Sequence, residues 1–431
     1  MQMRAHRVGA ALVAAALAAG HAAAQVPLTA RSLGMGNAYL GVALGQEALF
    51  LNPANIALPG NPHWSFSIPT FTAGATALGL SLGQVNSFRD FGELDQGERD
   101  QILADIPASG TELRADVRVP LVALQIRRFA LGVSYAFQGN HTLDRDIVDL
   151  LVNGYQPGRV YSIRNTGGLA ASYMDFAAAY ARRVGPVALG VTGHYYRGGT
   201  LGRMGVVAVD TIRPPAQPDV HVTYAGVHAE GGSGFGVDVG AAMRPAPGVT
   251  LSGSLSNVFN SFEWDADLRQ KSVTLTSQDY ESGSVESVLT RFDESERAFD
   301  AATAVDSVRR LAADLERDTG PPSVLRLGAA WEPRPSMVVA AAYQGNVANS
   351  RIGGMWDQSL GVGWQQRFSF VSLRAGVATD LEDGGLLSGG ITLGPLNLGL
   401  ARVHDGDVDG RPRTGWVATA SLSARSNSVM P

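Results

Sequence analysis

The sequence predicts an all-β protein: a transmembrane antiparallel β-barrel of about fourteen strands with an N-terminal plug and a helical loop insert. Its 52 glycines are scattered over 431 residues, and scattered glycine inside apolar segments suits strands. The mean hydropathy of +0.03 is too low for a bundle of membrane helices. A barrel avoids this objection because only alternate residues of each strand face lipid. Segments with period-two alternation, described below, are the third observation.

The first residues predict a secretory signal peptide over residues 1–24. Arg4 and Arg7 give a positive start, and a short apolar core follows from Val8 to Ala19. Small residues precede Gln25, as at an A-x-A cleavage site. The apolar stretch is well short of the ~20 residues that span a bilayer as a helix, so cleavage is favoured over anchoring.

From residue 119 onward, pairs of alternating segments joined by tight turns predict β-hairpins. Residues 130–138 place large apolar side chains on one face and small or polar ones on the other, and residues 122–127 do the same. The turn between them is predicted at Arg128 and Phe129. Residues 187–195 repeat the pattern after a turn at 184–186.

The remaining turns consist of residues that favour tight turns. They are predicted at residues 245–248 and 333–335, around Arg367, and at 394–395. Six turns give twelve strands, and a first strand within 63–83 and a last one near 413–424 raise the count to about fourteen. The barrel is therefore predicted over residues 62–424, with the tight turns on the periplasmic side and the longer stretches outside.

The two faces of these strands favour a barrel over a soluble β-sandwich, which also alternates. The apolar face carries the bulk, while the other face has Gly, Ala and Ser mixed with charges, as a narrow polar lumen would tolerate. By this parity His194, Asp238, Arg326 and Arg374 are the candidate lumen and ligand-binding residues. Aromatic residues near the strand ends fit an interfacial girdle. They are Tyr135, Phe137, Tyr195, Phe235, Trp331, Tyr343 and Trp364.

Residues 280–318 break the strand pattern. Their apolar residues are spaced by three and four among many charges, which predicts an amphipathic helical insert. Strand parity places this insert in an extracellular loop. It is expected to be a lid on the barrel rim or, alternatively, a docking surface for a partner.

Residues 25–61 are predicted to form a plug inside the lumen. Gly34 and Gly36 lie in a G-x-G-x-A-Y element, followed by Glu47 and then by Asn52-Pro53-Ala54. Glycine allows close backbone approach and Asn-Pro fixes a turn. This order of motifs resembles the plug of the FadL family of hydrophobic-compound transporters and is similar to that of PorV-type barrels. The resemblance implies a fourteen-stranded barrel around the plug.

Little in the sequence points to an enzyme, and no cofactor is expected. The eight histidines are dispersed outside G-x-S-x-G and H-E-x-x-H contexts, and there is no cysteine. A net charge of −5 argues against nucleic acid as a partner. Asp405, Asp407 and Asp409 resemble half of a calcium loop, but the position of the bidentate glutamate holds Trp416, so this metal candidate is weak.

The function expected from these features is passive uptake of hydrophobic, fatty-acid-like small molecules across the cell outer membrane, with outer-membrane lipid around the barrel. One alternative is a PorV-like barrel that binds or shuttles secreted proteins. Another is a structural barrel without a substrate.

Overall fold

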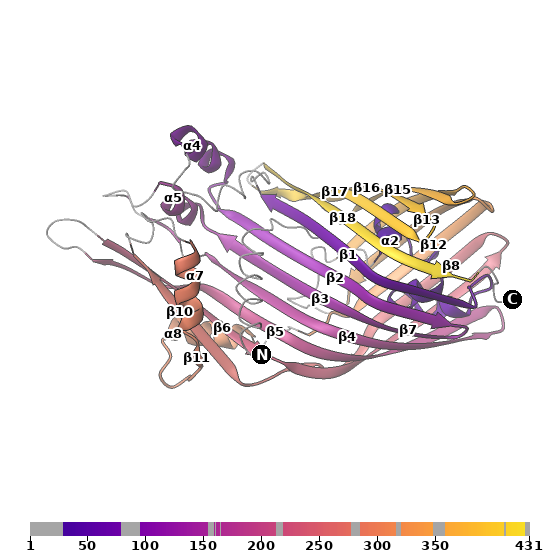
Figure 1. The fold of residues 1–431 in the computed structure, drawn as a ribbon, viewed down its shortest axis with the longest axis horizontal. Helices are drawn as coiled ribbons and strands as arrows, with labels where there is room; N and C mark the ends of the chain where they lie inside the picture. Colours follow the sequence, from indigo (N-terminus) through magenta and orange to yellow (C-terminus); the bar gives the residue numbers. More distant parts are fainter. Residues whose placement is uncertain are drawn as a thin grey trace.

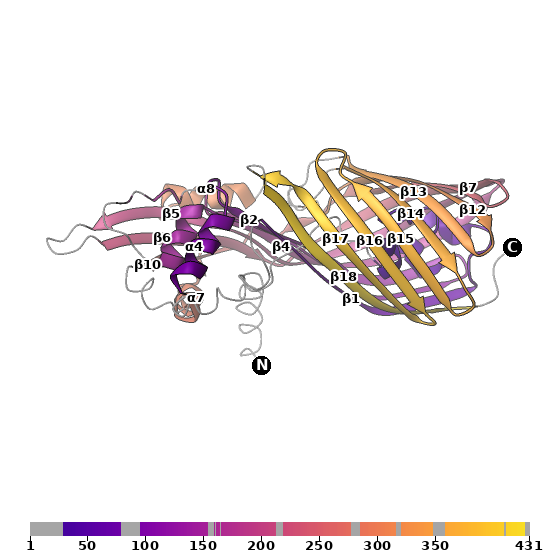
Figure 2. The ribbon, with the colours of Figure 1, turned by 90° about the horizontal axis from the view of Figure 1, so that it is seen from above.

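The computed structural model describes residues 29–78, 95–153, 159, 161–163, 165–212, 219–276, 285–315, 320–347, 358–408 and 411–426. The predicted signal peptide lies outside these residues. Fourteen antiparallel strands close into a barrel, which confirms the predicted closed antiparallel barrel and its strand number (Figures 1 and 2). In barrel order the strands are β1 Trp64–Leu78, β2 Thr111–Ile126, β3 Phe129–Leu143, β4 Gly167–Val184, β5 Val187–Ile212, β7 Gly232–Ala246, β8 Val249–Asn260, β12 Val324–Arg334, β13 Met337–Asn346, β14 Gln358–Arg367, β15 Val371–Thr379, β16 Gly384–Leu393, β17 Leu396–Val408 and β18 Arg411–Arg425.

The barrel closes where β1 pairs with both β2 and β18. The six predicted turns all lie at one end, here called the tight-turn end, on the right of Figure 1. One turn was predicted a residue too late. It consists of Arg127 and Arg128, and Phe129 already begins β3, because Arg127 takes a left-handed φ of 53° that reverses the chain.

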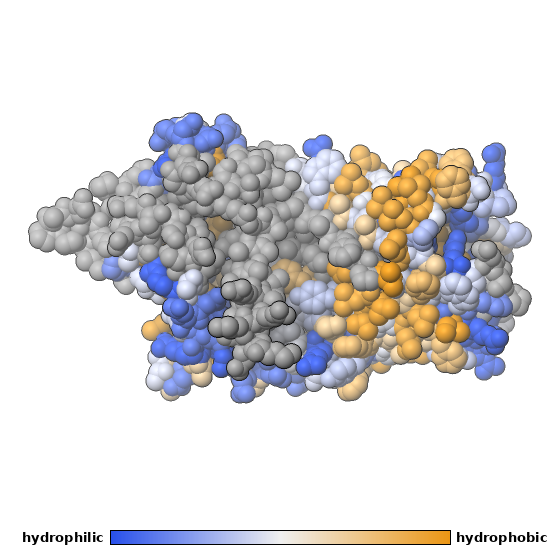
Figure 3. All heavy atoms as spheres, in the orientation of Figure 1, coloured by the Kyte–Doolittle hydropathy of each residue, from blue (hydrophilic) through white to orange (hydrophobic). Residues whose placement is uncertain are grey.

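Alternation along each strand divides the barrel into an apolar outside and a small, polar inside. On β3, for example, Leu131 is 57% exposed whereas Ser134 is fully buried. Figure 3 shows apolar side chains gathered on the barrel wall, with hydrophilic residues at both ends of the molecule. This outer face is the kind of surface that hydrocarbon covers.

A second sheet extends beyond the barrel at the end opposite the tight turns. The outer half of β5 leaves β7 and pairs with β6 (Asp219–Glu230), which pairs with β10 (Leu268–Leu275), and β10 pairs with β11 (Arg297–Ala298). Helices α7 (Val285–Glu294) and α8 (Asp306–Leu315) pack on this sheet, α7 on β10 and α8 on β5 and β6. We call this extension with its two helices the headpiece (left in Figures 1 and 2). Its strands were not predicted from the sequence.

The other elements are short. Helix α4 (Gln96–Asp105) begins with a capping box formed by Asp95 and Glu98, and α5 (Arg145–Asn153) lies near it. Strand β9 (Glu263–Trp264) pairs with the start of β7. The N-terminal segment, residues 29–61, contains α2 (Ala30–Gly34) and the 3₁₀ helices η1 (Gly45–Phe50) and η2 (Pro53–Ala57).

No helix among the described residues is both long and apolar enough to cross a membrane.

Candidate functional site: the lumen and its wall

The N-terminal segment lies inside the barrel and follows its inner wall. Helix α2 contacts β15 to β18, η1 contacts β1 to β4, and η2 contacts β4, β5, β7 and β8. Its apolar side chains are buried, and Leu33, Met35, Leu49 and Ile56 are 0% exposed. The segment therefore occupies the tight-turn half of the lumen. Whether it works as a plug stays a prediction.

Glycines in the wall let this segment approach the strands closely. The carbonyl of Gly36 faces Gly361 of β14 and its amide faces Gly376 of β15, so that a methyl group on either wall glycine would overlap the segment. Gly190 of β5 lies in the same way against Pro53 and Ala54. Glycine is required at these wall positions because any side chain would occupy the space of the segment's backbone.

The predicted turn Asn52-Pro53-Ala54 is held on the inner face of β7 and β8 by the Asn52 side chain. Its Nδ2 donates to the Ser252 hydroxyl at 2.7 Å and to the carbonyls of Ala241 and Gly253 at 3.0 Å, while its Oδ1 accepts from Ala54 N at 2.9 Å. Asn52 is fully buried. One amide thus fixes both the turn itself and its position on the wall.

A second set of polar contacts holds the beginning of the segment. Glu47 accepts a hydrogen bond from Tyr39 at 2.8 Å and pairs with Arg31 at 3.2 Å. Arg31 also donates to Asn397 of β17 at 2.8 Å and to Ser423 of β18 at 3.1 Å. This network therefore ties the segment to itself and to the barrel through a buried ion pair.

The middle of the lumen holds a buried ionic triad. His194 of β5 lies between two carboxylates: its Nδ1 donates to Asp175 of β4 at 2.8 Å, and its Nε2 lies 3.2 Å from Oδ2 of Asp238 on β7. The three side chains are between 0% and 8% exposed. Asp238 also accepts from the backbone N of Asn257 at 2.8 Å. The triad joins three neighbouring strands inside the wall.

Aromatic rings lie next to the triad on the headpiece side. Tyr196 stacks on His194 with 5.5 Å between ring centroids and meets Tyr173 and Phe262 edge to face. Phe262 in turn meets Trp264 edge to face at 4.9 Å. Such edge-to-face pairs are favourable and give a rigid apolar surface. A solute entering from the headpiece end would meet this aromatic cluster before the triad and the N-terminal segment.

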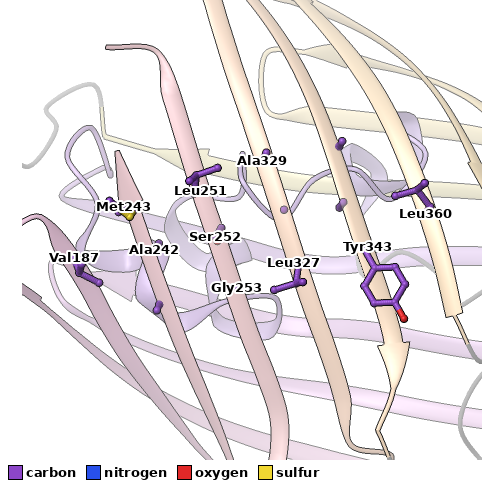
Figure 4. Close-up of a pocket in the computed structure, with 14 residues that line it drawn as sticks. Val187, Ala242, Met243, Leu251, Ser252, Gly253, Leu327, Ala329, Tyr343 and Leu360 are labelled. Carbon is purple, nitrogen blue, oxygen red and sulfur yellow. The ribbon is translucent and has the colours of Figure 1, made fainter. Parts of the chain in front are cut away.

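The outer face of the wall has an apolar groove of about 500 Å³ across β7, β8, β12, β13 and β14 (Figure 4). Leu251 and Leu327, two of its lining residues, are 43% and 49% exposed. Ala241, Ser252 and Gly253, the residues that Asn52 contacts from inside, also line this groove. A single layer of strand therefore separates the groove from the N-terminal segment.

The headpiece is held together by apolar and ionic contacts. Val308, Ala312 and Leu315 of α8 are buried with Leu201 and Val227 of the sheet. On α7, Phe292 packs on the Tyr224 ring at 6.1 Å between centroids. Near the end of α7, Lys271 of β10 pairs with Asp293 at 2.8 Å and with Glu296 at 3.1 Å, and Arg269 also pairs with Glu296. Although its partial burial opposes the shift, hydrogen bonds from Lys271 and Arg269 lower the pKa of Glu296.

One buried histidine should make this end of the molecule sensitive to acid. The Tyr224 hydroxyl lies at hydrogen-bond distance, 3.2 Å, from Nε2 of the His141 ring, and burial lowers the pKa of His141 from 6.5 to about 4. Because the folded-state pKa is depressed, protonation is easier once this region opens. Stability is full above about pH 6.5 and falls as the pH drops toward 4, by up to ~3 kcal/mol.

We expect hydrogen exchange at β6 amides to accelerate as the pH falls from 6.5 to 4, after correction for the intrinsic rate. His141→Phe should remove the part of this acceleration that comes from residue 141, because a phenyl ring cannot take up a proton. His228 of β6, whose pKa burial also lowers, accounts for the remainder. His63→Phe, at the tight-turn end, is the control and should behave as the wild type. A corrected rate that is constant over this range in the wild type would contradict the assignment.

The structure places the predicted site residues in two groups. His194 and Asp238 touch, and Arg326 lies close to them and donates to Ser256 at 2.6 Å. Arg374 lies apart from these three, near Tyr39 and Glu47, and donates to Gln365 and Thr392 at 2.8 Å. Of the predicted plug residues, Gly34 packs on Gly390 of β16 and the amide of Gly36 donates to Ser388 at 3.0 Å.

Several residues of the site were not predicted from the sequence. Asp175 is the main example, although a carboxylate on the inner face of an alternating strand is a usable signal. The Arg31–Glu47 pair and the aromatic cluster depend on contacts between distant segments. The side chains of the calcium candidates Asp405, Asp407 and Asp409 lie outside the described part, and no set of three His, Asp or Glu side chains within it could hold a metal ion.

No protein-family model and no curated protein sequence matches this chain. Among solved structures, a deltaS2S3 mutant of the TodX monoaromatic hydrocarbon channel of Pseudomonas putida is 13% identical, with a TM-score of 0.52 over 92% of this chain and 99% of that chain. The toluene transporter TbuX of Ralstonia pickettii is 13% identical over 93% and 97% of the two chains, with a TM-score of 0.48. A FadL homologue of Pseudomonas aeruginosa is 12% identical over 94% and 100%, also at 0.48.

The similarity to the TodX channel shows that this chain has the same barrel fold. The similarity to PorV-type barrels stays a prediction. The N-terminal motifs indicated a resemblance to FadL-type transporters, and at the level of the fold this resemblance is confirmed.

Proposed function

We propose that this protein is an outer-membrane channel for the passive uptake of hydrophobic small molecules. The observation that carries the proposal is the thin wall at β7 and β8, with the Asn52 turn on its inner face and an apolar groove on its outer face. A hydrophobic solute gains free energy by entering a bilayer, so it has no need to cross the water beyond the tight turns. Displacement of the Asn52 turn would open a path from the lumen to this groove.

The outer face of the barrel supports the proposed position in the outer membrane. The exposed leucines, valines and aromatics of the strands are the surface that lipid would cover. Because the number of strands is even, the start of β1 and the end of β18 both lie on the tight-turn side. The tight turns are then periplasmic and the headpiece is extracellular. The neighbours of known fold include channels for monoaromatic hydrocarbons and toluene, which supports an apolar solute without specifying a fatty acid.

Uptake into proteoliposomes tests this function. Toluene and hexadecanoate, each loaded outside, should enter faster than in protein-free vesicles, whereas a sugar of similar size should not. Equal acceleration for the sugar would indicate an open aqueous pore, and no acceleration for either apolar solute would contradict uptake.

Filling the groove tests the route separately. Ala329→Phe places a ring in the groove and should slow apolar uptake several-fold if solute leaves there, by steric exclusion. Val377→Phe adds the same ring on β15, where the side chain is 51% exposed and lies outside the groove, so its uptake should match that of the wild type. Equal uptake by both variants would place the exit elsewhere.

Deleting residues 280–318 separates uptake from the docking alternative. A channel should keep or increase its uptake, because the lumen and the groove lie outside the deleted region. A barrel that captures a secreted protein through the headpiece should lose that capture.

A further inference from the structure

The tight-turn end of the barrel is strongly basic. Within three residues of the six turns and of the paired ends of β1 and β18, the only carboxylate is Glu332. Seven of the eight arginines there are exposed, and Arg367 is half-buried. They are Arg127, Arg128, Arg182, Arg183, Arg244, Arg334, Arg367 and Arg425.

Four of these arginines come from two turns that lie side by side; we call them the arginine quartet. Arg127 and Arg128 form the β2–β3 turn, and Arg182 and Arg183 lie at the end of β4. The strands pair up to this level, because the Ala181 N–H donates to the carbonyl of Arg128 at 3.0 Å. Four positive charges are therefore held on adjacent strands at one edge of the barrel.

The quartet has no acidic partner among the residues that the structure describes. Its one side-chain contact to backbone is from Arg183 Nε to the carbonyl of Gly185 at 3.3 Å. By contrast, the headpiece cations Arg269 and Lys271 both pair with carboxylates. Four arginines on adjacent strands without a counter-charge among the described residues leave a local excess of positive charge, which an anion from outside the chain would offset.

Aromatic and apolar side chains lie just beyond the quartet on the outer face. Phe129 and Tyr180 face each other across β3 and β4 with 4.9 Å between ring centroids, and they are 62% and 40% exposed. Trp64 and Trp331, near the same end, are also exposed. Aromatic rings of this kind mark the boundary between hydrocarbon and headgroups. The quartet then lies at the depth of the headgroups, with apolar Leu131 on the hydrocarbon side.

We propose that the arginine quartet is a binding site for the phosphodiester headgroup of an anionic phospholipid of the periplasmic leaflet. Guanidinium groups bind phosphate oxygens in pairs of parallel hydrogen bonds. The Phe129–Tyr180 pair and Leu131 would contact the glycerol region and the first part of the acyl chains. This apolar neighbour favours a lipid over a soluble acidic protein, which would need no such surface. The site rests on the proposed membrane position and is independent of uptake.

The test uses the full-length protein in nanodiscs of phosphatidylethanolamine with a minor fraction of phosphatidylglycerol. Native mass spectrometry of the released protein measures how much phosphatidylglycerol is retained relative to its share of the bilayer. The wild type should be enriched in phosphatidylglycerol, and R127Q/R128Q/R182Q/R183Q should lower that enrichment by about tenfold or more. Heat-modifiable migration and toluene uptake report folding and channel function separately.

Two control variants distinguish a specific lipid-binding site from general electrostatic attraction between the basic end and anionic lipid. R127K/R128K/R182K/R183K keeps the charge and should keep a reduced part of the enrichment, because lysine cannot form the paired contact. R244Q/R334Q removes two charges from the same end of the barrel and should leave most of the phosphatidylglycerol enrichment. Three results would overturn the proposal: no enrichment in the wild type, the same loss for R244Q/R334Q as for the quartet, or quartet-dependent capture of soluble polyglutamate without phosphatidylglycerol enrichment.

Discussion

Gly190→Ala is expected to release the N-terminal segment from the wall and to raise apolar uptake by roughly ten- to a hundredfold. A methyl group at this position would overlap the backbone N of Ala54 and the carbonyl carbon of Pro53, and these atoms belong to the turn that Asn52 fixes. Overpacking of this kind costs about 1–3 kcal/mol, and that energy destabilises only the wall-bound position of the segment that the structure shows. The N-terminal segment, and not β5, should move, because ladder hydrogen bonds hold β5 on both sides.

Two measurements check this expectation. Because the chain has no cysteine, Leu58→Cys supplies a single thiol at a position where the native side chain is 2% exposed. Maleimide should label it faster when Gly190→Ala is added, and toluene uptake should rise in parallel. Gly193→Ala is the matched control on the same strand, since a methyl group there meets no atom within 4 Å. Equal labelling in the two alanine variants would show that the segment is not held by this contact.

The strands that lipid would cover could be predicted from the sequence, and the headpiece could not. Residues 187–195 alternate because one face meets apolar surroundings and the other meets the lumen. Beyond Gly198 the same strand pairs with β4 on one side and with β6 of the headpiece on the other, and α8 packs on it, so the alternation fades although β5 extends to Ile212. The sequence therefore indicated where the wall lies, and the turns indicated how many strands it contains.

The sequence predicted which residues of the candidate site face the lumen, but it predicted only partly which of them lie together. Parity along a strand identified His194, Asp238 and Arg374 as inward-facing, and all three are buried. Parity contains no information about position around the barrel, so it could not show that Arg374 lies apart from His194 and Asp238. The partner Asp175 is set by the register of β4 on β5, where Asp175 aligns with Tyr196 and Ala177 aligns with His194. Such register depends on turn geometry and long-range pairing more than on local pattern.

The triad leads to the second large expected effect, the loss of stability in His194→Phe. Removal of the imidazole leaves Asp175 and Asp238 buried on the two strands that flank β5, without the group that lies between them. Breaking a buried ion pair by removing one partner costs about 3–5 kcal/mol, because the remaining charge loses the partner that offset its desolvation. The midpoint of urea unfolding in lipid vesicles should therefore fall, while heat-modifiable migration reports whether the barrel still closes.

Neutral substitutions at the two carboxylates test whether buried charge causes the loss of stability in His194→Phe. His194→Phe combined with Asp175→Asn and Asp238→Asn removes both carboxylate charges and should recover a large part of the lost stability. A packing defect at residue 194 would persist in the triple variant, because the phenyl ring is still there. If the single variant is as stable as the wild type, the triad contributes no net stability. Its two carboxylates would then be balanced in another way, and Arg326 is the nearest candidate because it already lies close to Asp238.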